Sequence, residues 1–271
     1  MGVALLIHHK ILGHRRFSSE VDSMKGSLLG PVFSDEEILP YLDSVDAVYV
    51  KLSYEEVIRR TAELLAEEKV VGWFQGRMEF GPRALGCRSI LGDPRSKRMR
   101  SVMNLKIKFR ESFRPFAPSI LREHLMEYFE LDCDSPYMLL VAPVSEKIRT
   151  HETQSHQRGP CEIEKLNVLR SRIPAVTHVD YSARIQTVNR RSNPMYHDLL
   201  ESFFQLTGCP VVVNTSFNVR GEPIVCTPID AYRCFMWTGM DNLILGSYLL
   251  KKTDQPPFKE DMDKTGFYSL D

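Results

Sequence analysis

Two short pairs of polar residues suggest the chemistry of this chain. Lys108 and Arg110 are separated by one residue, and so are Ser216 and Asn218. Side chains two residues apart project to the same side of an extended chain, whereas a helix would separate them. Two cations, a hydroxyl and an amide could then surround one oxyanion, with the arginine supplying bidentate donors. The spacing predicts an anion site if the two pairs converge in space.

The first pair belongs to a segment with a local excess of positive charge. Residues 76–114 contain 11 Lys and Arg against 3 Asp and Glu, whereas the whole chain has 35 of each. A phosphate-bearing ligand is therefore the first hypothesis. Arg77, Arg83 and Arg114 are expected at the rim of the site, and Glu79 is interpreted as an ion-pair partner that orients the first two. Four other cations are interpreted as a helix surface, namely Arg95, Lys97, Arg98 and Arg100.

The second half of the chain adds two candidates. Arg184 stands beside the apolar run 185–188 and needs an anionic partner there. His178 and Asp180 have the spacing of a metal pair, but such residues at a strand end are more often hydrogen-bonded core or loop groups. His178 is therefore kept as a candidate for ligand binding, and no metal site is predicted.

Spacing excludes several other chemistries. Gly81 and Gly86 are set five apart as in a P-loop, but Cys87 and Arg88 follow where Lys and Ser or Thr should stand. The sequence has no dinucleotide-binding glycine fingerprint, no nucleophile elbow and no zinc-protease helix motif. Its six cysteines include no C-x-x-C pair, and no apolar stretch is long enough to span a membrane. A cytoplasmic protein with reduced thiols and no membrane partner is expected.

The helix and strand patterns alternate along the chain, and this order predicts an α/β domain. These elements must position the residues described above. Ser53 to Lys69 has the pattern of a capped amphipathic helix. Pro115 and Pro118 favour extended conformations in the residues before them, so the stretch that contains Lys108 is expected to be a strand or sheet edge. Further strands are predicted at 70–74, 137–141, 175–178, 185–188 and 211–213, and helices at 195–205 and 228–237.

Seven ordered motifs closely resemble the C-terminal half of the O-carbamoyltransferases of the nodulation-factor and antibiotic type. The match extends from about Leu29 to Lys251. The departures are Cys87, where the family usually has Asn, and a long insertion around Ser155. The motifs occupy residues 76–86, 88–91, 93–95, 113–119, 174–180, 214–218 and 222–225.

The resemblance implies the fold of threonylcarbamoyl-adenylate synthase (YrdC-like), a twisted mixed open α/β sheet with flanking helices and a basic concave surface. It divides the chain into a remnant of an actin-like domain with its linker at 1–45, the YrdC-like domain at 46–252 and a tail at 253–271. The signature of that fold falls on the two pairs described above, namely Lys108, Arg110, Ser216 and Asn218.

The resemblance also implies a reaction. Carbamoyl phosphate and ATP, with Mg²⁺ on the nucleotide, would give carbamoyl-adenylate, phosphate and pyrophosphate. Lys108, Arg110 and Arg184 would contact phosphate or carbamate oxygens, while Ser216 and Asn218 would hydrogen-bond the carbamoyl and phosphoryl groups. An actin-like N-terminal domain that holds an iron-type metal, or a separate chain that carries this domain, would complete the transfer to a hydroxyl acceptor. The acceptor is left open.

Two alternatives remain beside this interpretation. A basic concave surface can also bind RNA without chemistry. An RNA binder would be expected to interleave exposed aromatic residues with its cations, whereas Phe80, Phe113 and Phe116 sit beside Gly or Pro and are interpreted as core residues, which makes nucleic acid the less favoured ligand. The chain could otherwise be an inactive fragment that needs a partner chain.

Overall fold

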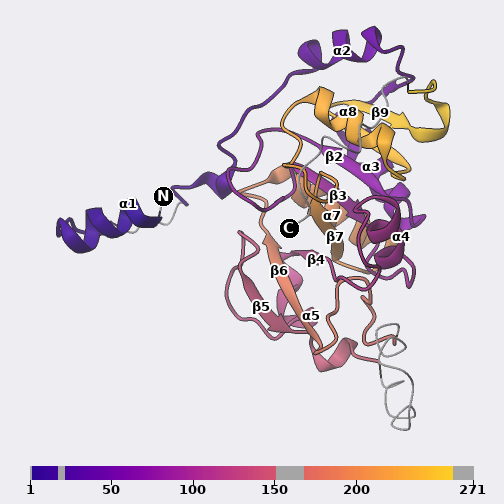
Figure 1. The fold of residues 1–271 in the computed structure, drawn as a ribbon. Helices are drawn as coiled ribbons and strands as arrows, with labels where there is room; N and C mark the ends of the chain where they lie inside the picture. Colours follow the sequence, from indigo (N-terminus) through magenta and orange to yellow (C-terminus); the bar gives the residue numbers. More distant parts are fainter. Residues whose placement is uncertain (1, 18–21, 151–167, 259–271) are drawn as a thin grey trace.

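The computed structural model describes residues 2–17, 22–150 and 168–258. In this part of the chain a nine-stranded mixed open sheet, with strand order β1-β9-β8-β2-β3-β7-β4-β6-β5, is flanked by helices (Figure 1). This architecture confirms the expected α/β class. The strands are β1 (Val50–Lys51), β2 (Val71–Phe74), β3 (Arg88–Gly92), β4 (Ala117–Leu121), β5 (Leu140–Pro143), β6 (Ser182–Val188), β7 (Val211–Ser216), β8 (Asn242–Leu245) and β9 (Tyr248–Lys251).

Three of the helices begin at capping residues that can be recognised in the sequence. Ser53 caps α3 together with Glu56, as predicted, and Asn193 and Thr227 cap α7 and α8 with a proline in the first turn. None of the helices in the described residues is both long and apolar enough to cross a membrane. The helices are α1 (Gly2–Leu6), α2 (Asp35–Ser44), α3 (Tyr54–Ala66), α4 (Met99–Lys106), α5 (Leu125–Tyr128), α7 (Pro194–Thr207) and α8 (Pro228–Trp237), with a π-helical turn at Ile7–Ile11.

The middle of the sheet supplies the rigid frame of the molecule. Every residue of β2, β3, β4 and β8 is buried, and so are the first four residues of β7. Strand β7 pairs antiparallel with β3 on one side and with β4 on the other, while β4 pairs parallel with β6. These pairings bring the ends of β7 and β6 next to the turn-rich loop that precedes β3.

Two predicted strands differ from the structure. The strand expected at 137–141 is displaced to β5, and the strand expected at 175–178 is a turn. In that turn the Thr177 hydroxyl donates to the Ile173 carbonyl and contacts the Ser171 hydroxyl. These local side-chain bonds compete with sheet pairing, which explains why a β-branched run does not form a strand here.

The N-terminal residues divide into an outlying part and a packed part. Helix α1 and the π-helical turn extend away from the sheet (Figure 1), with Val3 71%, Ile11 72% and Phe17 89% exposed. By contrast, Ile38 and Leu42 of α2 are fully buried in the same core as the sheet. The domain division expected at residue 45 stays a prediction. The insertion around Ser155 and tail residues 259–271 lie outside the described residues.

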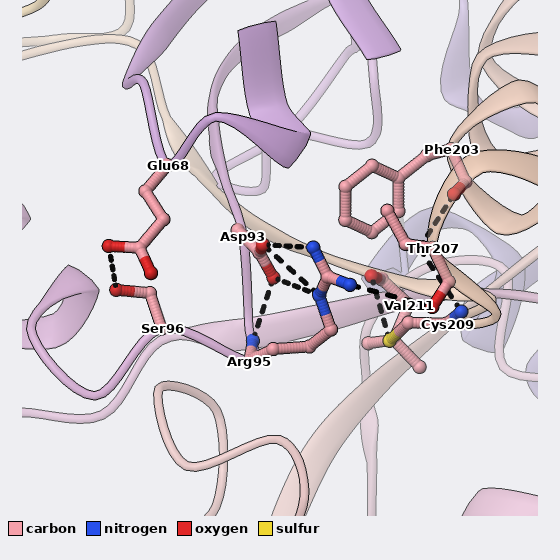
Figure 2. Close-up of polar contacts among 8 residues, drawn as sticks. All are labelled: Glu68, Asp93, Arg95, Ser96, Phe203, Thr207, Cys209 and Val211. Atoms are coloured by element: carbon pink, nitrogen blue, oxygen red, sulfur yellow. Dashed lines mark hydrogen bonds and ion pairs between the residues drawn. The ribbon is translucent and has the colours of Figure 1, made fainter. Parts of the chain in front are cut away.

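The cations after β3 do not form a continuous helix surface, so that interpretation was wrong. Lys97 and Arg98 are exposed turn residues, and Arg100 lies within α4. Arg95 donates from Nε and Nη2 to the buried Asp93 carboxylate and stacks on Phe203, 5.4 Å from its ring centre (Figure 2). The Arg95 contacts tie the loop before α4 to helix α7.

A substitution at Gly86 tests how tightly this frame holds the loop before β3. Gly86 has φ +104°, and a Cβ there would lie 2.2 Å from Cδ1 of the buried Tyr196. We expect Gly86→Ala to lower the free energy of unfolding by about 3 kcal/mol or more, because strain and overpacking add. Urea denaturation measures the change. Gly208→Ala, at φ +68° with open space around the site, should cost only about 1–2 kcal/mol; equal losses would contradict the packing argument.

Candidate functional site

The loop before β3 is organised by the carboxylate of Glu79. Glu79 is 3% exposed, and its Oε1 accepts hydrogen bonds from the backbone N–H groups of Leu85 (2.7 Å), Cys87 (2.7 Å) and Arg88 (3.3 Å). The expectation that Glu79 pairs with flanking arginines was therefore wrong. The carboxylate instead satisfies three buried donors of a turn that has no secondary structure to satisfy them.

Arg88 also holds the loop before β3, through hydrogen bonds to backbone carbonyl oxygens. Its guanidinium is fully buried, 3.5 Å from the centre of the Phe74 ring, and donates to the carbonyl oxygens of Gln75, Gly76 and Pro31. Burial lowers the pKa of Arg88, while the negative charge of Glu79 opposes that shift. The arginine thus binds the start of the loop, its end and the N-terminal segment to one another.

Side chains of three strands hold the other face of the same loop. Asn214 of β7 donates to the Ala84 carbonyl (3.2 Å), and Gln186 of β6 donates to the Leu85 carbonyl (2.8 Å). The Ser119 hydroxyl of β4 joins them, since it donates to Gln186 and accepts from Asn214. All three residues are buried, so this network fixes the backbone next to Arg83 with neutral groups.

Lys108 meets both members of the second polar pair. Its Nζ donates to Asn218 Oδ1 (2.7 Å), the Asn218 carbonyl (2.8 Å), Ser216 Oγ (3.2 Å) and the Ser216 carbonyl. The Ser216 hydroxyl in turn donates to Asn218 Oδ1 (2.6 Å). An ammonium has three N–H groups and four oxygens surround this one, so Lys108 supplies positive charge beneath Ser216 while it is protonated, and its hydrogens stay within the protein. Burial lowers the pKa of Lys108 to about 7.

The first pair reaches the site by a turn, so the predicted extended conformation was wrong. Lys108 and Arg110 follow the end of α4, and Phe109 between them has φ +46°, which is rare for an aromatic residue. The Lys108 and Arg110 N–H groups continue to bond to the end of α4, at Met103 O and Asn104 O. Local helix-end bonds therefore override the extended conformation, although Pro118 does lie in β4 as expected.

A cavity of about 160 Å³ lies between the loop before β3, the turn that carries Arg110, and strands β4, β6 and β7. We call it the anion cavity, because three of the side chains that line it are arginines. None of the described residues that line it is acidic. Burial lowers the pKa of Arg184 and of Arg110, and a neighbouring arginine lowers each further. The lining comprises Pro82, Arg83, Ala84, Arg110, Pro115, Phe116, Ala117, Met138, Arg184, Asn214, Thr215 and Ser216.

The three arginines of the anion cavity lack carboxylate partners among the described residues. Arg184 Nε is buried without a hydrogen-bond partner, and Arg110 Nε contacts the amide oxygen of Asn104 at 2.6 Å. Arg83, expected at the rim, lies in the cavity lining itself. Such unpaired guanidinium groups favour binding of a compact polyanion.

Five predicted site residues do not line the anion cavity: Lys108 and Asn218 lie behind Ser216, and the other three contact other parts of the protein. Arg77 is exposed and donates to the Gly30 carbonyl, and Arg114 pairs with Glu111 at 2.9 Å. His178 contacts the Ser182 hydroxyl at 3.2 Å, and burial lowers its pKa. The ligand contacts assigned to all nine sequence-predicted residues remain predictions.

Sequence reasoning missed the amides that hold the cations in place. Asn104, Gln186 and Asn214 are buried polar residues in elements whose patterns mark them as core positions. A polar residue at a core position was the available signal, but its partners could not be deduced from spacing. The aromatic interpretation was also incorrect, since Phe80 is 62% and Phe113 48% exposed, and only Phe116 of the three is buried.

The chain is similar in sequence to the C-terminal parts of carbamoyltransferases and related proteins. A family model described as "Carbamoyltransferase C-terminus" matches residues 62–252. An uncharacterized protein of Synechocystis sp. is 57% identical over 100% of this chain, which covers 44% of that protein. Nodulation protein NolNO of Sinorhizobium fredii is 45% identical over 75% of this chain and 27% of its own length. A 3'-hydroxymethylcephem-O-carbamoyltransferase of Streptomyces clavuligerus is 38% identical over 67% and 30%, respectively. The chain thus spans less than half the length of these relatives.

The lowered pKa of Lys108 gives a stability prediction with a definite sign. Between about pH 7 and pH 10.5 the unfolded chain holds a proton on Lys108 that the folded chain has released, so stability rises with pH. Relative to Lys108→Met, the free energy of unfolding of the unaltered protein should increase by up to about 1.4 kcal/mol per pH unit in this window. Urea denaturation between pH 6 and pH 9 measures the difference. Parallel curves for the two proteins would show that Lys108 titrates normally.

Proposed function

This chain belongs to the family of carbamoyltransferase C-terminal domains, and from that premise we propose that it activates a carbamoyl group by forming carbamoyl-adenylate from carbamoyl phosphate and ATP. The observation that carries the proposal is the anion cavity, in which three arginines face one space without an acidic residue in the lining. A phosphate chain and a carbamate are both compact anions, so they match this charge.

The proposed reaction has two steps. Water releases phosphate from carbamoyl phosphate and leaves carbamate. A carbamate oxygen then attacks the α-phosphorus of ATP, and the bond from that phosphorus to the pyrophosphate oxygen breaks. Negative charge increases on the phosphoryl oxygens during the second step, and cations that are already in place there lower the barrier.

The residues in and behind the lining of the anion cavity would have different roles in this reaction. Arg83, Arg110 and Arg184 would contact phosphate and carbamate oxygens directly. Ser216 lines the cavity, and its single hydroxyl proton, which is donated to Asn218 Oδ1, would turn toward a phosphoryl or carbamoyl oxygen when the ligand binds. Lys108 lies behind Ser216 and donates to its Oγ. Asn218 would act mainly by orienting Lys108, whose hydrogen bond its side-chain oxygen accepts.

A magnesium ion fits this site only if the nucleotide supplies most of its ligands. The lining offers no carboxylate, and the described residues contain no group of three or more His, Cys, Asp and Glu that could hold a metal. Bound to the phosphates, Mg²⁺ would neutralise part of their charge, as in other phosphoryl-transfer enzymes. The arginines would bind the oxygens that the ion leaves free.

Exchange of pyrophosphate into ATP, dependent on carbamate, tests the proposed reaction. We expect Arg110→Ala and Ser216→Ala each to lower the exchange rate by roughly a hundredfold or more, because each removes a donor to the charge that develops in the transition state. Labelled pyrophosphate measures the exchange, and thermal melts check folding. Arg59→Ala, on the exposed side of α3 where Arg59 pairs with Glu63, is the matched control and should retain full exchange.

Unchanged exchange in either cavity variant would refute the role of that residue. A second candidate function, RNA binding, is favoured by the exposed Phe80 and Phe113 beside the cations of the loops. An unstructured RNA that binds with a steep salt dependence, in a protein that shows no exchange with carbamate and ATP, would support this candidate and overturn the proposed reaction.

Transfer to a hydroxyl acceptor is proposed to need the part of the longer relatives that this chain does not match. The exposed apolar side chains that follow one another along α1 and the π-helical turn support a docking contact for that part, because contiguous exposed apolar surface marks interaction sites. The partner would be the actin-like domain implied by the resemblance, either linked to this chain or carried by a separate one.

Substitutions in α1 test this contact. We expect Val3→Ser together with Leu6→Ser to weaken binding of the separately produced N-terminal portion of the Synechocystis relative by roughly tenfold or more, because apolar burial is lost. Calorimetry measures the affinity, and carbamate-dependent exchange should be unchanged in this chain alone. An affinity equal to that of the unaltered chain would place the contact elsewhere.

A further inference from the structure

Arg110 is held in the anion cavity by neutral groups. Several other described arginines pair with carboxylates, as in the pairs of Arg95 with Asp93 and Arg114 with Glu111. Arg110 instead has an amide oxygen at Nε and the Phe116 ring 4.9 Å from its guanidinium carbon. Neither of these two neighbours carries a charge. Glu111, Arg114 and Arg220 are the charged groups that act on Arg110, and none of them forms an ion pair with it. The guanidinium is therefore oriented without a carboxylate partner.

The amide belongs to Asn104, which is fully buried in α4. Its side-chain oxygen accepts from Arg110 Nε, and its side-chain nitrogen donates to the carbonyls of Ser112 (3.1 Å) and Arg114 (2.8 Å). Its backbone carbonyl accepts from the Arg110 N–H (3.1 Å). One residue thus fixes both ends of the loop that carries Arg110 as well as the direction of the guanidinium.

We propose that Asn104 is a positioning residue of the anion cavity, which directs Arg110 toward the ligand through a neutral amide and so preserves the full charge of the guanidinium for anion binding. This inference rests on the proposed function, since it assumes that the cavity binds anionic substrate groups. The inference concerns the neighbours of Arg110, which determine whether the charge of its guanidinium is available to a ligand.

Electrostatics explains why an amide suits this position better than a carboxylate. Aspartate has nearly the same shape as asparagine and would also accept from Arg110 Nε. Its charge, however, would pair with Arg110 and repel an anion in the adjacent cavity, and such interactions are strong where water is largely excluded. An amide gives the same direction to the guanidinium without either effect.

Two substitutions at Asn104 test this role, with pyrophosphate as the probe. Alanine removes every side-chain bond of Asn104. Aspartate keeps the acceptor for Arg110 and adds a charge, but it loses the N–H donors to the Ser112 and Arg114 carbonyls. The proposal predicts that the Kd of Asn104→Asp is higher than that of Asn104→Ala by at least about tenfold. Because the lost donors could also displace the loop, the dependence of this loss on Arg110 is tested separately. Calorimetry at constant ionic strength measures both, and thermal melts verify folding.

A double-substitution cycle shows whether the effect passes through Arg110. In an Arg110→Gln background, Asn104→Asp should weaken pyrophosphate binding by no more than about threefold, because the guanidinium that it neutralises is gone. If aspartate acted by displacing the loop, the loss would persist in this background, because the loop would still move. Asn189→Asp controls for the added charge, since Asn189 is exposed at the end of β6 and its side-chain oxygen remains an acceptor for the Arg191 N–H.

The outcomes separate this inference from the function on which it rests. An Asn104→Asp protein that binds pyrophosphate as tightly as Asn104→Ala, or a loss that persists without Arg110, overturns the role of Asn104 and leaves the proposed function intact. An unaltered protein that does not bind pyrophosphate overturns both. Binding in the predicted order by a protein that fails to exchange pyrophosphate into ATP supports Asn104 as an anion-site residue and overturns the proposed reaction. If Asn104→Asp does not fold, Asn104→Ser, which retains an acceptor without a charge, should bind better than Asn104→Ala, and an equal affinity would overturn the inference.

Discussion

The buried loop between β2 and β3 can exist only because side chains satisfy its backbone. Residues 84–87 lie inside the protein before the ladder of β3 begins, and an unpaired buried N–H or carbonyl costs roughly 1–3 kcal/mol. Glu79 accepts from the N–H groups of Leu85 and Cys87 and from that of Arg88 at the start of β3. The amides of Asn214 and Gln186 donate to the carbonyls of Ala84 and Leu85. The Trp73 indole donates to a third carbonyl, that of Gly86. The position of Arg83, and with it the shape of the anion cavity, depends on this arrangement.

The second constraint is the concentration of positive charge that this loop helps to enclose. Three guanidinium groups around about 160 Å³ repel one another, and the cost of desolvation lowers the pKa values of Arg184 and Arg110. A protein selected only for stability would pair them with carboxylates. Here neutral amides hold the backbone beside Arg83 and the side chain of Arg110. The charge of these arginines is therefore available to a ligand, and the free energy of unfolding is lower than it would be with carboxylate partners.

Charge and hydrogen bonding are divided between two layers in the site. The arginines line the cavity, while Lys108 lies behind Ser216 with its hydrogens directed at protein oxygens. Ser216, the last residue of β7, and Asn218 are thereby held in place by contacts within the protein, and such preorganisation favours stabilisation of developing charge. The sheet contributes this rigidity, because β7 is paired on both sides and its first four residues are buried.

The sequence alone determined the features that depend on neighbours within a few residues. Helices α3, α7 and α8, strands β2 and β7, the local excess of cations and the two polar pairs all follow from caps, periodicity and spacing. The tertiary structure alone decided which distant groups meet. Glu79 contacts backbone N–H groups rather than arginines, Lys108 reaches the second pair by a turn rather than a strand, and Asn104 holds Arg110. Sequence pattern records burial and local geometry, whereas the partner of a buried polar group is set by strand order and helix packing across a hundred residues.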